Sequence, residues 1–387
     1  MARSCTNLLF GQLTIKRFRR ISPSRYTAMQ ECLLREVWAA SGNDFLLPPS
    51  PRAELGNIAH RILEAAGRGE LKGTGSEEVN ERWESLVSEA EARMALSPLR
   101  RQQTPLSQSI PDFHVLRLRT CNKAVEIARD GHRCSGKLPK LSRRATGFEL
   151  WVESDDGALG GFIDRASETT EGVVLSDYKS GAVLEMGPEK YSRELKHVYR
   201  IQMQLYAALY RQITETLPVR LEVIPLQGEP IEVVFEPEHA ERLLLEAKKF
   251  LQVANNRIDA VQDGTMDTTV LAVAIPEYCR LCLFRPACSA YWDARQREID
   301  ARWPADVRGI LEKSILLRNG KICLRIRQTD SPSLSSIVVR GVTDSVDRHP
   351  LLTSMPIGSG VAVYGLQRDY RSCDYIETQN TVIYRTD

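Results

Sequence analysis

The stretch from Gly160 to Gly181 constrains the fold most strongly, because it combines two strand patterns with charged residues at a fixed spacing. GGFIDRA and VVLSDYKSG are rich in β-branched and aromatic residues, and the polar turn SETTEG separates them. FELWVES, just upstream, has the same character. The three segments predict a meander of adjacent strands.

Three charged residues of this meander are expected to share one cleft. Alternation along a strand places Asp177 and Lys179 on the same face, roughly 7 Å apart. The short turn brings Asp164 alongside Asp177. Two neighbouring carboxylates repel each other unless a cation lies between them, and hard oxygen ligands suit Mg²⁺ or Mn²⁺. A lone D-x-K on a surface hairpin is usually only solvated, so the rest of the sequence must decide between the two interpretations.

Helical patterns flank the meander on both sides. A helix is expected to start at Ser22-Pro23, a second follows the breaker LLPPSPR, and a charged helix covers about 75–96. Residues 117–144 indicate an irregular, basic segment. After the meander come a helix over YRIQMQLYAALYRQI, the hairpin VRLEVIPL–EPIEVVFE and a helix over about 237–260. The apolar faces of the first two helices are formed by Tyr26, Met29, Leu33 and Val37, and by Leu55, Ile58, Ala59, Ile62, Leu63 and Ala66.

Four short motifs occur in an order that points to a known family. They are L-G-x-x-x-H ending at His60, GFIDR with Asp164, DYKSG with Asp177 and Lys179, and Q-x-x-x-Y formed by Gln202 and Tyr206. Asp177 follows Asp164 by thirteen residues. Over about residues 20 to 295, the chain resembles the RecB-like branch of the PD-(D/E)XK nucleases. The resemblance implies an α/β restriction-endonuclease-like core, in which helices flank a mixed sheet.

The resemblance also implies a role for each motif residue. His60, Asp164, Asp177 and the main-chain carbonyl of Tyr178 would hold Mg²⁺ or Mn²⁺, and Lys179 would orient or polarise the attacking water. A carboxylate-bound metal suits phosphodiester hydrolysis, since it activates water and neutralises charge on the phosphoryl oxygens. The amide and aromatic side chains of Q-x-x-x-Y, Gln202 and Tyr206, suit a phosphate and a base or sugar. Glu149 occupies a place where relatives often carry an acid.

The nine cysteines contain one tight group, C-x2-C-x5-C, formed by Cys279, Cys282 and Cys288. Grouped thiols without a secretory signal favour metal or cluster ligation over disulfides. A zinc site would usually show a second C-x-x-C or a histidine pair nearby, so the fourth ligand must come from elsewhere. The remaining cysteines other than Cys32 show no ligand spacing.

Two groups of relatives supply that fourth ligand from an N-terminal helix. Nucleases of the AddB type and CRISPR-associated RecB-like exonucleases bind a [4Fe–4S] cluster through one such cysteine and three at the end of the nuclease domain. ISPSRYTAMQECLLREVW resembles their N-terminal segment, which nominates Cys32. Leu33 stands where these relatives usually have proline. Zinc in the same four thiolates and Cys5 as another fourth ligand remain alternatives.

After about Ile299, the sequence pattern changes to short segments rich in strand-forming residues. Short segments such as GKICLRIRQ, SSIVVRGV and GVAVYGLQRDY, separated by turn residues, predict a small all-β domain. A five-stranded OB-like barrel fits this pattern best. The expected division is therefore a nuclease domain over 1–298, with the cluster as a staple, and a β domain over 299–387.

Composition limits the functional classes. The net charge of +2 does not indicate binding of nucleic acid through bulk charge, so a local patch is needed, such as 117–144 or Lys16, Arg17, Arg19 and Arg20. No run is apolar enough for a signal peptide or a membrane span, which predicts a cytoplasmic protein. No P-loop motif is present, so unwinding of duplex would need a separate helicase or ATPase subunit.

These observations favour a metal-dependent DNA nuclease that acts on single-stranded or end-exposed DNA, in DNA processing and repair or in anti-phage defence. Two other functions stay open. The chain could be a non-catalytic Fe–S DNA-binding subunit of a helicase-nuclease or defence complex, although its intact Asp164, Asp177 and Lys179 argue against this. It could instead be a protein-interaction scaffold, in which the cluster and the barrel are only architectural.

Overall fold

The structure is a computed structural model that describes residues 13–71, 76–133, 146–187, 192–298, 300–329, 336–352, 354–372 and 374–387. Cys5, Cys134, Cys373 and the second half of the basic stretch after 133 lie outside these ranges. Among the described residues, no helix is both long and apolar enough to cross a membrane.

A five-stranded mixed sheet forms the centre of the larger part of the molecule. Its order is β1 (Gly147–Glu153), β2 (Gly160–Glu168), β3 (Val173–Lys179), β6 (Arg220–Pro225) and β7 (Ile231–Glu232). Strands β1, β2 and β3 form the expected antiparallel meander, whereas β3 and β6 run parallel. The mixed α/β core predicted from the sequence is confirmed.

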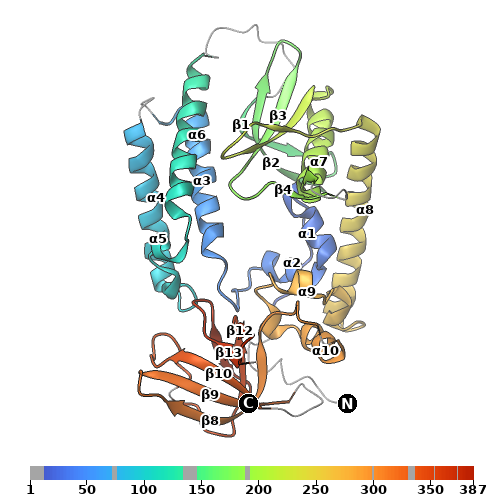
Figure 1. The fold of residues 1–387 in the computed structure, drawn as a ribbon. Coiled ribbons are helices and arrows are strands. Elements are labelled where there is room, and N and C mark those ends of the chain that lie inside the picture. Colours follow the sequence, from blue (N-terminus) through green and yellow to red (C-terminus); the bar gives the residue numbers. More distant parts are fainter. Residues whose placement is uncertain are drawn as a thin grey trace.

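Helices cover the sheet on two sides (Figure 1). One group contains α3 (Pro51–Gly67), α4 (Ser76–Leu96), the short α5 (Leu106–Ser109) and α6 (Phe113–Arg133), and its core includes Tyr178 and Ile224 from the sheet. The other group contains α7 (His197–Thr214) and α8 (Pro237–Gln262), whose core includes Ile163 and Leu175. The short strands β4 (Leu184–Met186) and β5 (Arg193–Leu195) pair with each other just before α7.

Helix α6 corrects the sequence interpretation, because residues 117–133 are helical and not irregular. In the sequence, the many basic residues obscured the helical spacing of the apolar residues. Leu116, Ala124, Ile127 and Ala128 are buried at helical spacing against α3 and α4, whereas Arg119 and Arg129 are exposed.

The first predicted helix is two helices. A 3₁₀ turn (Pro23–Arg25) leads into α1 (Tyr26–Glu31), and α2 (Leu33–Ala40) follows after Cys32. Cys32 is extended, with φ −157° and ψ 100°, which breaks the run of helical hydrogen bonds. Leu33 occupies the first position of α2, where a helix tolerates proline because the N–H there has no intrahelical partner.

The segment with the other three cysteines consists of short elements. It contains a 3₁₀ turn (Thr268–Leu271), α9 (Pro276–Cys279), a second 3₁₀ turn (Arg285–Ala287) and α10 (Ser289–Arg297). Its residues pack in the same core as α1, α2, α7 and α8. At the end of the nuclease region, the chain therefore packs against the N-terminal helices.

The C-terminal region is a seven-stranded sheet, in the order β12 (Gln367–Asp369), β13 (Asp374–Ile376), β10 (Ser336–Thr343), β9 (Lys321–Gln328), β8 (Val307–Leu316), β11 (Gly360–Tyr364) and β14 (Val382–Arg385). The expected count of five strands was too low, because short strands such as β12 and β13 carry too few residues to show an alternating pattern. The edge strands β12 and β14 do not pair in the described residues, so a closed OB-like barrel is not confirmed.

A buried aspartate joins this sheet to the cysteine segment. Asp306, just before β8, is fully buried, and its carboxylate accepts hydrogen bonds from Arg285 (2.5 and 3.3 Å), Tyr291 Oη (2.8 Å) and the backbone N–H of Gly365 (2.9 Å). Arg295 donates to the Asp306 carbonyl. The domain boundary at 298/299 remains a prediction. The contacts of Asp306 join residues before this boundary to residues after it.

Candidate active site

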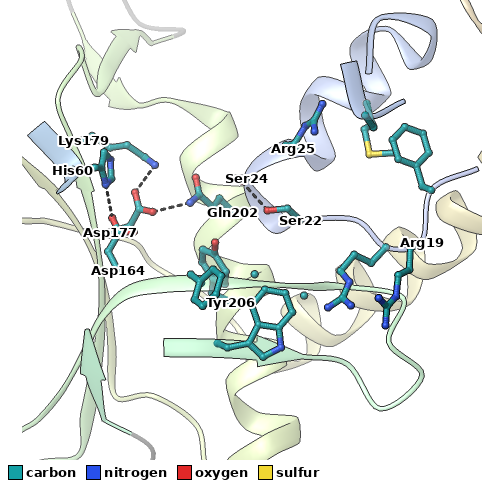
Figure 2. Close-up of a pocket in the computed structure, with 18 of the residues that line it drawn as sticks. Arg19, Ser22, Ser24, Arg25, His60, Asp164, Asp177, Lys179, Gln202 and Tyr206 are labelled. Atoms are coloured by element: carbon teal, nitrogen blue, oxygen red, sulfur yellow. Dashed lines mark hydrogen bonds and ion pairs between the residues drawn. The ribbon is translucent and has the colours of Figure 1, made fainter. Parts of the chain in front are cut away.

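The six predicted site side chains line one cleft of about 680 Å³. They come from α3, β2, β3 and α7. Figure 2 shows the acidic group beside His60 and Lys179, with Gln202 and Tyr206 next to it and Arg19 and Arg25 across the cleft. The cleft lining contains His60, Asp164, Asp177, Lys179, Gln202 and Tyr206, together with Lys16, Arg17, Arg19, Arg20 and Arg25 from the N-terminal segment.

Asp177 is the most enclosed acid of the cleft. It is buried, and its Oδ1 accepts a hydrogen bond from Gln202 Nε2 at 2.7 Å. Its Oδ2 lies 2.6 Å from Lys179 Nζ as an ion pair. The Lys179 ammonium is therefore the cation that neutralises this oxygen.

Asp164 lies beside Asp177, as the turn between β2 and β3 predicts. Its Oδ2 accepts a hydrogen bond from the backbone N–H of Tyr178 at 2.7 Å and lies 3.7 Å from His60 Nδ1. Burial and the neighbouring charge of Asp177 raise the pKa of Asp164 well above its ordinary value. The two carboxylates thus repel each other, which is the electrostatic condition that a divalent cation relieves.

His60 reaches the acids from α3. Its ring also forms a hydrogen bond to the main chain of Tyr178 that favours the protonated form, as a bond donated to the carbonyl oxygen does. Burial and the charge of Lys179 nevertheless lower the pKa of His60, and a neutral imidazole is the form that binds metals. Metal binding by His60 and the Tyr178 carbonyl remains a prediction.

Gly56 explains how α3 can approach so closely. A Cβ atom at Gly56 would lie 3.0 Å from Ser180 Oγ, just after β3. The glycine of L-G-x-x-x-H therefore allows contact between the helix and the strand end, and His60 follows one turn later.

Lys179 stays charged in spite of its burial. Desolvation alone would lower its pKa, but the charge and hydrogen bond of Asp177 together with the charge of Asp164 raise it. Its ammonium group also lies 5.0 Å from the centre of the Tyr199 ring, a cation–π contact that the motifs did not reveal. Tyr199 stands three residues before Gln202 on α7, so helical spacing from Gln202 could have identified it.

Gln202 and Tyr206 are both buried, although both line the cleft. Gln202 holds the Asp177 carboxylate, so the structure gives it a positioning contact. Tyr206 belongs to the hydrophobic core, and its hydroxyl would lie 3.2 Å from a Cβ at Gly161, which is why the floor of the cleft there carries no side chain. Their contacts with a substrate remain predictions.

Glu149 has an unusual backbone and is not part of the cleft lining. Its φ of 50° is left-handed, which is uncommon for a residue other than glycine. Burial and the charge of Glu64 raise the pKa of Glu149. A functional role for Glu149 remains a prediction.

The four cysteines predicted as cluster ligands line a second, much smaller cavity. Cys32 comes from the break between α1 and α2, and Cys279, Cys282 and Cys288 come from the segment before α10. Burial and the neighbouring thiols Cys282 and Cys32 raise the pKa of Cys279 to about 12, and burial raises that of Cys282 to about 11. Cations or metal ions would be needed to hold these thiols as thiolates.

In neither cavity do three or more His, Cys, Asp or Glu side chains of the described residues form a group that could hold a metal ion. At the active site, Asp177 turns its Oδ2 toward Lys179 instead. The donor set still fits a divalent cation, because two adjacent carboxylates repel each other and oxygen ligands suit such an ion.

The comparisons with known proteins agree with this site. A family model described as the PD-(D/E)XK nuclease superfamily matches residues 20–289 of the 387-residue chain. No curated protein matches the chain. The match covers α1 to α9 and the six predicted site side chains of the cleft, so the chain belongs to the PD-(D/E)XK nuclease superfamily.

Proposed function

We propose that this chain is a Mg²⁺- or Mn²⁺-dependent deoxyribonuclease of the RecB-like branch that hydrolyses single-stranded or end-exposed DNA. Members of its superfamily are mostly metal-dependent nucleases. One observation carries the proposal: a single cleft is lined on one wall by Asp164, Asp177, Lys179 and His60. Its other wall is basic. DNA processing, repair and anti-phage defence are the settings in which such an enzyme would act.

In the proposed reaction, water attacks phosphorus and the bond to the leaving deoxyribose oxygen breaks, while the proton of the water passes to solvent and the leaving oxygen takes a proton from solvent. His60, Asp164, Asp177 and the Tyr178 carbonyl would hold the divalent ion, which activates water and neutralises the phosphoryl oxygens when bound. Lys179 stabilises the hydroxide that forms when the attacking water loses a proton. Gln202 keeps the Asp177 carboxylate in place through its 2.7 Å hydrogen bond. Arg19 and Arg25 hold the phosphates on the other wall of the cleft.

The proposal is tested with end-labelled and circular single-stranded DNA in Mg²⁺, Mn²⁺ or EDTA. We expect cleavage in at least one metal and none in EDTA. Cleavage of linear but not circular substrate would identify an exonuclease. Tight binding without cleavage in either metal would favour a non-catalytic DNA-binding subunit, and absence of both would favour a scaffold. A requirement for added helicase would support a separate motor subunit.

His60→Ala is expected to lower cleavage at least about tenfold, since the loss of metal-site residues typically has effects of this size. The decrease should be larger in Mn²⁺ than in Mg²⁺, because a nitrogen ligand suits Mn²⁺ better. Initial rates in the two metals measure this. His239→Ala on α8, an exposed histidine outside the cleft, is the control. Equal rates for His60→Ala and the parent in both metals would make His60 only structural.

We also propose that Cys32, Cys279, Cys282 and Cys288 bind a [4Fe–4S] cluster that staples the nuclease domain. The support is that all four line the same cavity from opposite ends of the domain sequence. Zinc remains the alternative metal.

Cys32→Ser is expected to lose most of the iron and to lower the melting temperature. The link from Cys32 to Cys279 closes a loop of about 250 residues, which by the chain-entropy estimate for disulfides corresponds to about 5 kcal/mol. Iron content and thermal unfolding of anaerobically purified protein measure both effects. Cys323→Ser on β9 is the control. Full iron and an unchanged melting temperature in Cys32→Ser would point to another ligand, with Cys5 tested next, whereas one zinc in the parent would change only the metal.

A further inference from the structure

Two exposed aromatic side chains stand at the mouth of the cleft. Trp151 on β1 and Phe162 on β2 are direct cross-strand partners, and their ring centres lie 4.8 Å apart in an edge-to-face arrangement. Trp151 is 39% exposed and Phe162 is 51% exposed, whereas the other four tryptophans are no more than 5% exposed. Large aromatic surface left in water beside a cleft indicates a binding surface.

The Trp151 ring is held in place by its neighbours. The Arg20 guanidinium lies 5.0 Å from the ring centre and forms an ion pair with Glu153 at 2.7 Å. The indole N–H donates to Glu153 Oε2 at 3.3 Å. A Cβ at Gly160 would lie 3.0 Å from the indole, so the glycine leaves room for it. A ring that is already ordered loses little freedom when a ligand stacks on it.

The aromatic pair lies next to the proposed catalytic acids. Phe162 precedes Asp164 by two residues on β2, which corresponds to roughly 7 Å along the strand. Both residues line the cleft. A phosphate at Asp164 would therefore have its neighbouring base within reach of the two rings.

The cations around the two aromatic rings favour a nucleic acid as the ligand. Lys16 and Arg19 line the same cleft, are exposed, and form no ion pair with another described residue. Aromatic rings beside free cations are the combination that binds single strands, because bases stack on the rings while cations neutralise the backbone. In a duplex the base faces are covered by their neighbours, so only an unpaired base can use such rings.

We propose that Trp151 and Phe162 stack an unpaired base next to the phosphate held at Asp164 and Asp177, so that the cleft selects single-stranded DNA over duplex. This inference rests on the proposed nuclease function and names its substrate. The stacked base anchors the strand, and Arg19 and Lys16 contact its backbone.

Intrinsic fluorescence tests the stacking directly, because Trp151 is the single exposed tryptophan of the five. In EDTA, which prevents cleavage, oligo(dT) is expected to quench part of the parent's tryptophan emission. Trp151→Phe should lose this quenching and keep most of the affinity, which is measured separately by anisotropy of a labelled oligonucleotide. Trp151→Ala should weaken single-strand binding about tenfold and leave duplex binding unchanged.

Tyr370→Ala is the matched control, since Tyr370 is an exposed aromatic residue beside β12, outside the cleft. It should bind single strands like the parent. Parent protein that cleaves and binds single strands without quenching, or Trp151→Ala protein that binds them with parental affinity, would overturn the stacking and leave the nuclease intact. Parent protein that neither binds nor cleaves DNA would overturn both proposals.

Discussion

Asp177→Asn is expected to reduce DNA cleavage about a thousandfold, a loss of roughly 4 kcal/mol in transition-state stabilisation. The change preserves the shape of the side chain and removes its charge. The cleft then loses the carboxylate that pairs with Lys179 and would hold the metal. The same change relieves the repulsion of Asp164 but removes the counter-charge of Lys179, so thermal unfolding is measured beside the rates. Single-turnover rates in Mg²⁺ and Mn²⁺ measure the loss.

The matched control is Glu222→Gln on the neighbouring strand β6. Glu222 is the register partner of Ser176 and carries a carboxylate outside the cleft lining, so its variant should cleave at the parental rate. Lys179→Ala should resemble Asp177→Asn, since it removes the positive charge beside the forming hydroxide. Undiminished Mn²⁺-dependent cleavage by both site variants would eliminate the proposed centre.

Asp306→Asn is expected to lower the free energy of unfolding by about 3 to 5 kcal/mol, because it leaves the buried Arg285 guanidinium without a counter-charge. Urea denaturation measures this. Replacing both residues, as Arg285→Met with Asp306→Leu, should recover much of the stability. Asp387→Asn is the control, since Asp387 and its partner Arg385 are both exposed and such pairs contribute no more than about 1 kcal/mol. Equal destabilisation by the two single asparagine variants would show that the buried ion pair contributes no more to the free energy of unfolding than an exposed one.

The elements predicted correctly are those with a local pattern. The meander followed from alternating strand residues and one short turn, and α7 followed from a long apolar stripe. The neighbourhood of Asp164 and Asp177 followed from the same turn. His60 was different, because no local pattern links residue 60 to β3. Its place came from the family resemblance, and the contact of Gly56 with Ser180 gives the physical reason for it.

Features that depend on distant contacts could not be predicted. Cys32 interrupts a sequence with good helical periodicity, and only the cavity shared with the three later cysteines makes the break understandable. The helix over 117–133 was hidden by its exposed basic residues. Trp151 and Phe162 look like ordinary strand residues until the register places them side by side at the cleft.

The two separate hydrophobic cores on either side of the sheet have a consequence for thermodynamic linkage. Residues beside His60 on α3 pack in one core, whereas Met203 and Leu205 beside Gln202 on α7 pack in the other. An ion bound by His60 and the two acids would connect the layers, so its binding energy would add to their cohesion. The melting temperature should therefore rise with Mn²⁺ concentration before any substrate is present.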